Sequence, residues 1–111
     1  MRLHIVDRNE LLDAESRELA ERRLRFALTR FDAELDRVVL TLQDENGGQK
    51  GGIDKSCRLA VYLRSGDAVT VSDVDATVVA AVSRVAERAA RTVARTIERR
   101  REKSGSPSMA G

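Results

Sequence analysis

Five arginines near the carboxyl end of the 111-residue chain recur at intervals of three or four residues. In a helix, with about 100° per residue, this spacing aligns them in one stripe that is roughly 22 Å long. The five residues are Arg84, Arg88, Arg91, Arg95 and Arg99. A guanidinium group presents a planar fork of N–H donors that fits the oxygens of a phosphate. The stripe therefore predicts contact with a polyanion, and contacts of this kind position a protein without reading base sequence.

The distribution of charge supports a polyanionic partner more strongly than the total charge does. The whole chain carries a net charge of +2 at pH 7. Residues 84–103 hold eight basic and three acidic side chains, a net charge of +5, so the rest of the chain sums to −3. Such segregation in a small domain is typical of nucleic-acid binding. The alternative interpretation is a solvated helix face without a partner.

Residues that could support catalysis or metal binding are few and unpaired in the sequence. His4 is the only histidine and Cys57 the only cysteine, so neither has a partner at ligand spacing. The acidic and glycine-rich stretch 44–57 does not have the spacing of a calcium loop or of a phosphate-binding glycine motif. We therefore expect no enzyme activity, no metal, no cofactor and no small-molecule substrate.

The arginine stripe requires a long helix over 76–103, whose opposite side carries the apolar residues that a core would bury. Upstream, a second helical period runs from about Asp13 to Leu35, with Leu19 and Phe26 off its apolar face. Asp13 is expected to cap that helix, and Asp73 or Asp75 to cap the long one. Alternation of apolar and polar residues predicts strands over 2–8, 37–43, 55–64 and 68–72.

This order, β-α-β-β-β-α, predicts an α+β fold in which a four-stranded sheet carries both helices on one face. The handedness rule for β-α-β units places the first strand parallel to the second. We expect a hairpin loop over 44–55, one domain over 1–103 and a disordered tail over 104–111. The open face of the sheet would carry Val39, Thr41, Arg58, Tyr62, Arg64 and Thr70.

The composition also bears on the compartment. The sequence has no apolar run long enough to cross a membrane, and its first residues lack the apolar core of a signal peptide. A single cysteine allows no intrachain disulfide, which agrees with a reducing environment. We therefore expect a cytoplasmic protein without membrane contact.

Three segments resemble the ribosome hibernation-promoting factors, also called the ribosome-associated inhibitor A or protein Y family. They are the opening HIVDRN, the Arg30-Phe31 pair that ends the first helix, and ERAARTVAR in the last helix. Arg88, Arg91 and Arg95 match the i, i+3, i+7 spacing of basic residues in the family's last helix. The stretch LQDENGGQKGGIDKSC, residues 42–57, is similar to the hairpin of a short branch of the family. The resemblance covers roughly residues 1–102.

The resemblance implies a fold close in outline to double-stranded RNA-binding domains. It also implies binding to the small ribosomal subunit, in the channel of messenger and transfer RNA, with inhibition of translation in starved cells. Longer relatives add a C-terminal domain that pairs two ribosomes. Because this sequence ends in SGSPSMAG, we expect a monomer on single ribosomes, with weak dimers through sheet edges as a further expectation.

The leading hypothesis is thus a non-enzymatic, ribosome-associated stress factor that contacts ribosomal RNA through arginines. The expected contacts are Arg84, Arg88, Arg91, Arg95 and Arg99, with Arg23, Arg30, Arg58 and Arg64 as lesser candidates. Two alternatives stay open. One is a double-stranded RNA-binding module that acts off the ribosome. The other is a protein-interaction module whose open sheet face and acidic hairpin bind a regulator.

Overall fold

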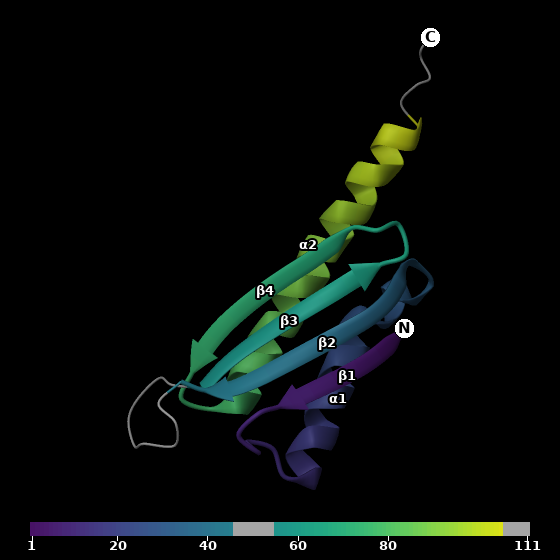
Figure 1. Ribbon diagram of the computed structural model, residues 1–111. Coiled ribbons are helices and arrows are strands. Elements are labelled where there is room, and N and C mark those ends of the chain that lie inside the picture. Colours follow the sequence, from purple (N-terminus) through teal and green to yellow (C-terminus); the bar gives the residue numbers. More distant parts are fainter. Residues whose placement is uncertain (46–54, 106–111) are drawn as a thin grey trace.

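The computed structural model describes residues 1–45 and 55–105, with side chains as far as Glu102. The two stretches contain seven elements in the order that Figure 1 shows. They are β1 (Arg2–Asp7), α1 (Ala14–Leu28), the 3₁₀ helix η1 (Thr29–Glu34), β2 (Leu35–Asp44), β3 (Lys55–Leu63), β4 (Ala68–Asp75) and α2 (Val78–Gly105). The predicted β-α-β-β-β-α order is confirmed.

The four strands form one mixed sheet in the order β1-β2-β3-β4. β1 pairs with β2 in parallel, as the handedness rule for the crossover predicts. β2 with β3 and β3 with β4 are antiparallel, with Leu40 opposite Leu59 and Leu59 opposite Val71. The β3–β4 turn needs the left-handed backbone of Gly66, whose φ is +100°. At this position a side chain would be strained even though the space around it is open.

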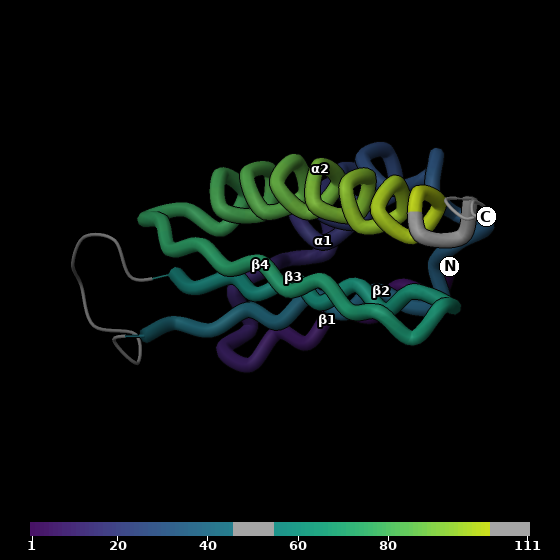
Figure 2. Tube along the Cα trace, turned by 90° about the horizontal axis from the view of Figure 1, so that it is seen from above, coloured from purple at the N-terminus to yellow at the C-terminus, as the bar shows by residue number. Residues whose placement is uncertain are grey.

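Both helices cover the same face of the sheet, as Figure 2 shows. In Figure 1, α1 lies behind β1 and β2, and α2 lies behind β3 and β4. Every second strand residue faces the helices, so period-two alternation decides which residues the core buries. The buried apolar strand residues are Leu35, Val38, Leu40, Leu42, Cys57, Leu59, Val61, Leu63 and Val69. The predicted α+β layering is confirmed.

The predicted first helix ends too late. Asp13 caps α1 as expected, with Oδ1 accepting the Ser16 N–H at 2.7 Å, which lowers the pKa of Asp13. The α-helix, however, ends at Leu28 rather than Leu35, and η1 follows. The tighter 3₁₀ winding keeps Phe31 in the core and delivers Leu35 to the sheet, where it pairs with Leu63. A continuous helix would leave no residues to reverse the chain.

The predicted last strand is too short, and the predicted cap of the long helix is wrong. β4 continues past Ser72 to Asp75, and α2 begins at Val78. The first helical hydrogen bond runs from the Ala81 N–H to the Thr77 carbonyl at 3.3 Å. Asp73 and Asp75 lie in β4, and their carboxylates bind Arg84 on α2. Asp75 also accepts the N–H of Thr77, at 3.0 Å, one residue before the helix begins.

Parts of two further predictions lie outside the described residues. The expected hairpin loop falls on 46–54, between β2 and β3, and most of the expected tail falls on 106–111. α2 itself runs to Gly105, slightly beyond the predicted end at residue 103. Among the described residues, no helix is long and apolar enough to cross a membrane.

Candidate nucleic-acid interface

The apolar side of α2 fixes the direction in which its arginines point. Val82, Val85, Ala89 and Val93 are almost completely buried against the sheet and α1. Because the arginine stripe lies on the opposite side of the helix, all five arginines are exposed. Arg84 and Arg88 nevertheless reach toward the edge strand β4, so exposure alone does not show which arginines are available to a ligand.

The first arginine of the stripe is held by two carboxylates of β4. Nε of Arg84 donates to Asp73 and Nη2 donates to Asp75, both at 2.5 Å. These hydrogen bonds lower the pKa of Asp73 and raise the pKa of Arg84; the pKa of Asp75 is lowered first by the Thr77 N–H and then by Arg84. We call Asp73, Asp75 and Arg84 the β4 clamp. It joins the start of α2 to the edge strand.

Arg88 is partly engaged by the same strand. Its Nη1 donates to the Ser72 carbonyl at 2.9 Å and lies 3.9 Å from the Asp73 carboxylate. Together, Arg84 and Arg88 carry two positive charges next to the two negative charges of Asp73 and Asp75. The first turns of the predicted stripe are therefore close to electrically neutral.

The remaining three arginines carry charge that no carboxylate offsets. Among the described residues, Arg91, Arg95 and Arg99 form no ion pair, and Nη2 of Arg95 makes a long contact of 3.5 Å with Thr92 Oγ1 of the same helix. We call Arg91, Arg95 and Arg99 the outer arginine row. At 1.5 Å per residue, the row extends for roughly 12 Å along the helix axis.

A groove of about 610 Å³ runs between α1 and α2 beside the outer arginine row. Three alanines line it: Ala86 and Ala90 of α2 are buried in the core, and Ala27 of α1 is partly buried against it. Arg23 and Arg30 rise from α1, and Arg91 rises from α2. The groove also includes the Phe26 side chain, which is 79% exposed, and one acidic residue, Glu87. The two α1 arginines predicted as lesser candidates thus adjoin the row.

Arg58 belongs to a different surface. It lies on the open face of the sheet, where a shallow hollow of about 300 Å³ is lined by Val39, Thr41, Arg58, Ala60, Tyr62 and Thr70. The predicted composition of this face is confirmed except at Arg64. Beside the hollow, the Arg37 guanidinium lies 4.4 Å from the centre of the Tyr62 ring.

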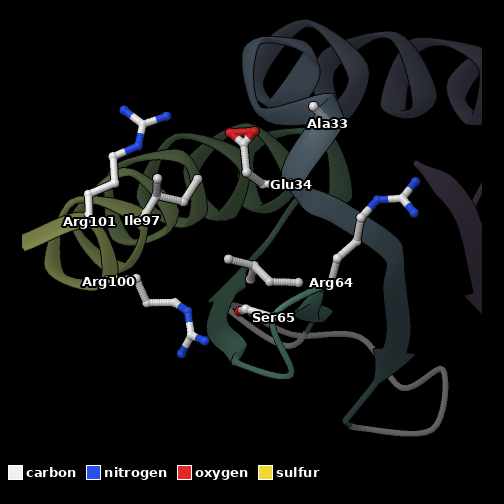
Figure 3. A pocket seen from close by; sticks show the side chains of 8 residues that line it. Ala33, Glu34, Arg64, Ser65, Ile97, Arg100 and Arg101 are labelled. Carbon is white, nitrogen blue, oxygen red and sulfur yellow. The ribbon is translucent and has the colours of Figure 1, made fainter. Parts of the chain in front are cut away.

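Arg64 follows β3 and lines a pocket of about 550 Å³ at the end of the sheet, with Ile97, Arg100 and Arg101 of α2. Three guanidinium groups around one pocket would suit an anion if they converged. In Figure 3 they point away from one another, and the Glu34 carboxylate lies among them. Nη1 of Arg100 is held 3.3 Å from Asp67 in the β3–β4 turn. This pocket does not concentrate positive charge at one point.

The only histidine and the only cysteine of the sequence lie on opposite faces of the sheet. His4 is exposed on the open face of the sheet. Cys57 is buried, and burial, with a smaller effect of Asp73, raises the pKa of its thiol to about 12. Within residues 1–45 and 55–105, no three histidine, cysteine, aspartate or glutamate side chains are grouped as a metal site would need. The candidate site is therefore built on exposed arginine side chains.

Comparisons with known proteins give one informative result. No family model matches the chain, and no curated protein does. Among solved structures, the chain matches the crystal structure of the Thermus thermophilus Protein Y N-terminal domain with a TM-score of 0.67. The match covers 86% of this chain and 99% of that one, at 25% sequence identity. This match supports the hibernation-promoting factor family for the chain.

Some features of the candidate site follow from spacing along one element, and others depend on how the elements pack. Helical spacing identified the arginines. The helical period of α1 showed that Phe26 lies off the apolar face, but its position beside Arg91 depends on how α1 packs against α2. The sequence pattern does not reveal the β4 clamp, because an aspartate just before a helix is typical of an N-cap. A usable signal was present, since Asp73 and Asp75 continue the alternation of Val69 and Val71.

Proposed function

We propose that the protein is a ribosome-associated hibernation factor that binds the small subunit through its helix layer and inhibits translation. It would act in the cytoplasm of cells under stress, without catalysis. The observation that carries the proposal is the outer arginine row on a Protein Y fold, since Arg91, Arg95 and Arg99 are exposed on α2 and form no ion pair with any residue that the structure describes. Ribosomal RNA is the polyanion for which such a row is suited.

The contacts of each arginine suggest different contributions to binding. Arg91, Arg95 and Arg99 would bind phosphates directly because no carboxylate in the described part of the chain competes for them. Arg23 and Arg30 would extend this surface across α1. Arg88 would contribute less because Ser72 and Asp73 already hold it, and Arg84 would chiefly fix α2 to β4. Arg58 and Arg64 point from other surfaces and would be dispensable.

Charge reversal of the outer arginine row tests the proposal. Arg91→Glu with Arg95→Glu should abolish cosedimentation with small subunits through a sucrose gradient at low salt. Wild-type binding should weaken steeply as salt rises, because phosphate contacts release counterions. The matched control, Arg91→Lys with Arg95→Lys, keeps the charge and should retain most of the binding. A charge-reversed protein that still sediments with ribosomes would move the interface elsewhere.

Translation inhibition needs a separate measurement. Added to a cell-free translation reaction, the wild-type protein should reduce synthesis, and the charge-reversed variant should not. If the protein binds subunits without reducing synthesis, the inhibitory part of the proposal fails and ribosome association stands.

A double-stranded RNA-binding role off the ribosome uses the same charges and is distinguished by competition. Affinities for small subunits and for a plain RNA duplex are compared at the same salt concentration. Preference for the subunit supports the ribosomal proposal, and equal affinity per site supports the general module. A partner that survives nuclease treatment would instead favour the protein-interaction alternative.

A further inference from the structure

The groove between α1 and α2 contains an aromatic ring that the core does not need. Phe26 is 79% exposed, although burying a phenylalanine is normally worth about 1.5–3 kcal/mol. The residues of α1 that face the core, Leu24 and Leu28, are buried on either side of it in the sequence. Phe26 therefore leaves most of its side chain open to solvent, in a groove that three alanines also line.

Three cationic side chains line the same groove as this ring. Arg23 stands on the same helix and Arg91 on the facing helix, and neither forms an ion pair or a side-chain hydrogen bond with a described residue. Arg30 lines the same groove, with its guanidinium 4.6 Å from the centre of the Phe31 ring. Glu87 is the one acidic residue in the lining, so the groove carries a net positive charge.

An exposed aromatic ring that shares a groove with guanidinium groups matches the two parts of a nucleotide. Bases stack on aromatic rings regardless of their sequence, and the forked guanidinium binds the adjoining phosphates. A base can reach such a ring only if it is not paired and stacked in a duplex. An acidic peptide would satisfy the arginines but would leave the ring without a planar partner.

We propose that this groove binds one unpaired nucleotide of an RNA, with its base on Phe26 and its phosphates on Arg23 and Arg91. The proposal rests on the RNA-binding function above and specifies its target. The outer arginine row would follow the phosphate backbone, and the groove would select positions where a base is turned out of a helix. Recognition would depend on RNA structure rather than on base identity.

Fluorescence tests the position of the base directly, because the chain contains no tryptophan. Phe26→Trp places a single reporter in the groove of the full-length protein. A short unstructured RNA should quench its emission, whereas the same backbone without bases, or the RNA in a perfect duplex, should not. Val74→Trp is the matched control, because Val74 is 43% exposed on the open face of the sheet and should not respond.

Affinity provides a second measurement. Phe26→Ala should weaken binding of the unstructured RNA about five-fold or more and leave duplex binding within two-fold. Arg91→Gln should weaken both and reduce the salt dependence by about one phosphate contact. Because Phe26 is outside the core, unfolding by urea should show that Phe26→Ala is still folded.

The outcomes separate this inference from the proposed function. Unchanged affinity after Phe26→Ala, or an unquenched reporter, overturns the nucleotide site. Quenching by an oligo-glutamate peptide but not by RNA also overturns it and assigns the groove to an acidic protein. If the nucleotide site fails while Arg91→Glu with Arg95→Glu still releases the protein from ribosomes, the proposed function stands. If the groove binds unpaired RNA but the protein never sediments with ribosomes, the inference stands without that function.

Discussion

At the scale of single residues, Arg84 and Arg91 show how the same side chain acquires different roles on one helix. Both lie in the stripe that helical spacing defines. Arg84 donates to two carboxylates, so its charge is neutralised within the molecule. Arg91 has no such partner among the described residues and stands beside a groove. Spacing alone identifies which arginines are aligned, and only the tertiary contacts show which of them are available to a ligand.

The β4 clamp makes stability depend on acid pH. The Arg84 guanidinium holds the pKa of Asp73 below its ordinary value of 3.8, and the pKa of Asp75 is lowered as well. A carboxyl group with a lowered pKa in the folded state stabilises the fold above its unfolded pKa. That stabilisation is lost as the pH falls through the lower, folded pKa. The clamp should therefore stabilise the protein at pH 7, begin to lose this effect below about pH 4, and lose it fully once the pH is below the folded pKa.

Urea unfolding at a series of pH values measures this effect. Asp73→Asn with Asp75→Asn should be less stable than the wild type at pH 7, and the difference should shrink as the pH falls below 3.8. Arg84→Gln is the control that removes the cation instead, and it should converge on the wild type in the same range. A difference that is independent of pH would show that the carboxylates act without their charge.

At the scale of elements, one turn of α1 contains both a residue of the core, Leu24, and the residue proposed to contact a ligand, Phe26. Leu24 is 1% exposed and Phe26 is 79% exposed. Leu24→Ala should cost about 2–5 kcal/mol of stability because it leaves a cavity beneath the sheet. Phe26→Ala should change stability by no more than about 0.5 kcal/mol. Urea unfolding of both variants checks the contrast, and equal losses would mean that Phe26 supports the fold rather than a ligand.

Much of the fold could be predicted from the sequence because two simple periods control it. Alternation placed Leu40, Leu59 and Val61 on the buried face, and the helical period placed Val85 and Val93 toward the core. These predictions are confirmed because sheet and helix geometry repeat regularly, whatever the neighbours are. Element ends were less accurate. Aspartate is normally disfavoured in strands. β4 nevertheless extends to Asp75, because Arg84 of the following helix forms ion pairs with both Asp73 and Asp75.

The candidate site could be predicted only in part. The outer arginine row follows from spacing within one helix, so the sequence contains that information. The groove does not follow from spacing, because it requires Phe26 of α1 to lie beside Arg91 of α2. That relation depends on the angle and offset at which the helices pack. The alanines at their contact allow the close approach, but their sequence positions alone do not specify which residues then meet.

At the scale of the whole molecule, the two faces of the sheet are chemically different. The helix layer carries the outer arginine row and the groove, whereas the open face carries Arg58 and Tyr62 around a shallow hollow. The two surfaces lie on opposite sides of the sheet, so a flat stretch of RNA cannot touch both. If the protein binds the ribosome as proposed, one face would dominate, and the arginines without an ion pair among the described residues favour the helix layer.

Matched charge reversals on the two faces test this division. Arg58→Glu and Arg91→Glu change the net charge by the same amount, so any effect of total charge on association is equal. Arg91→Glu should weaken binding to small subunits strongly and reduce its salt dependence, because it removes a phosphate contact. Arg58→Glu should leave the salt dependence unchanged and alter the affinity only slightly. If both variants lose binding equally, long-range attraction controls association; if Arg58→Glu alone loses it, the open face of the sheet is the interface.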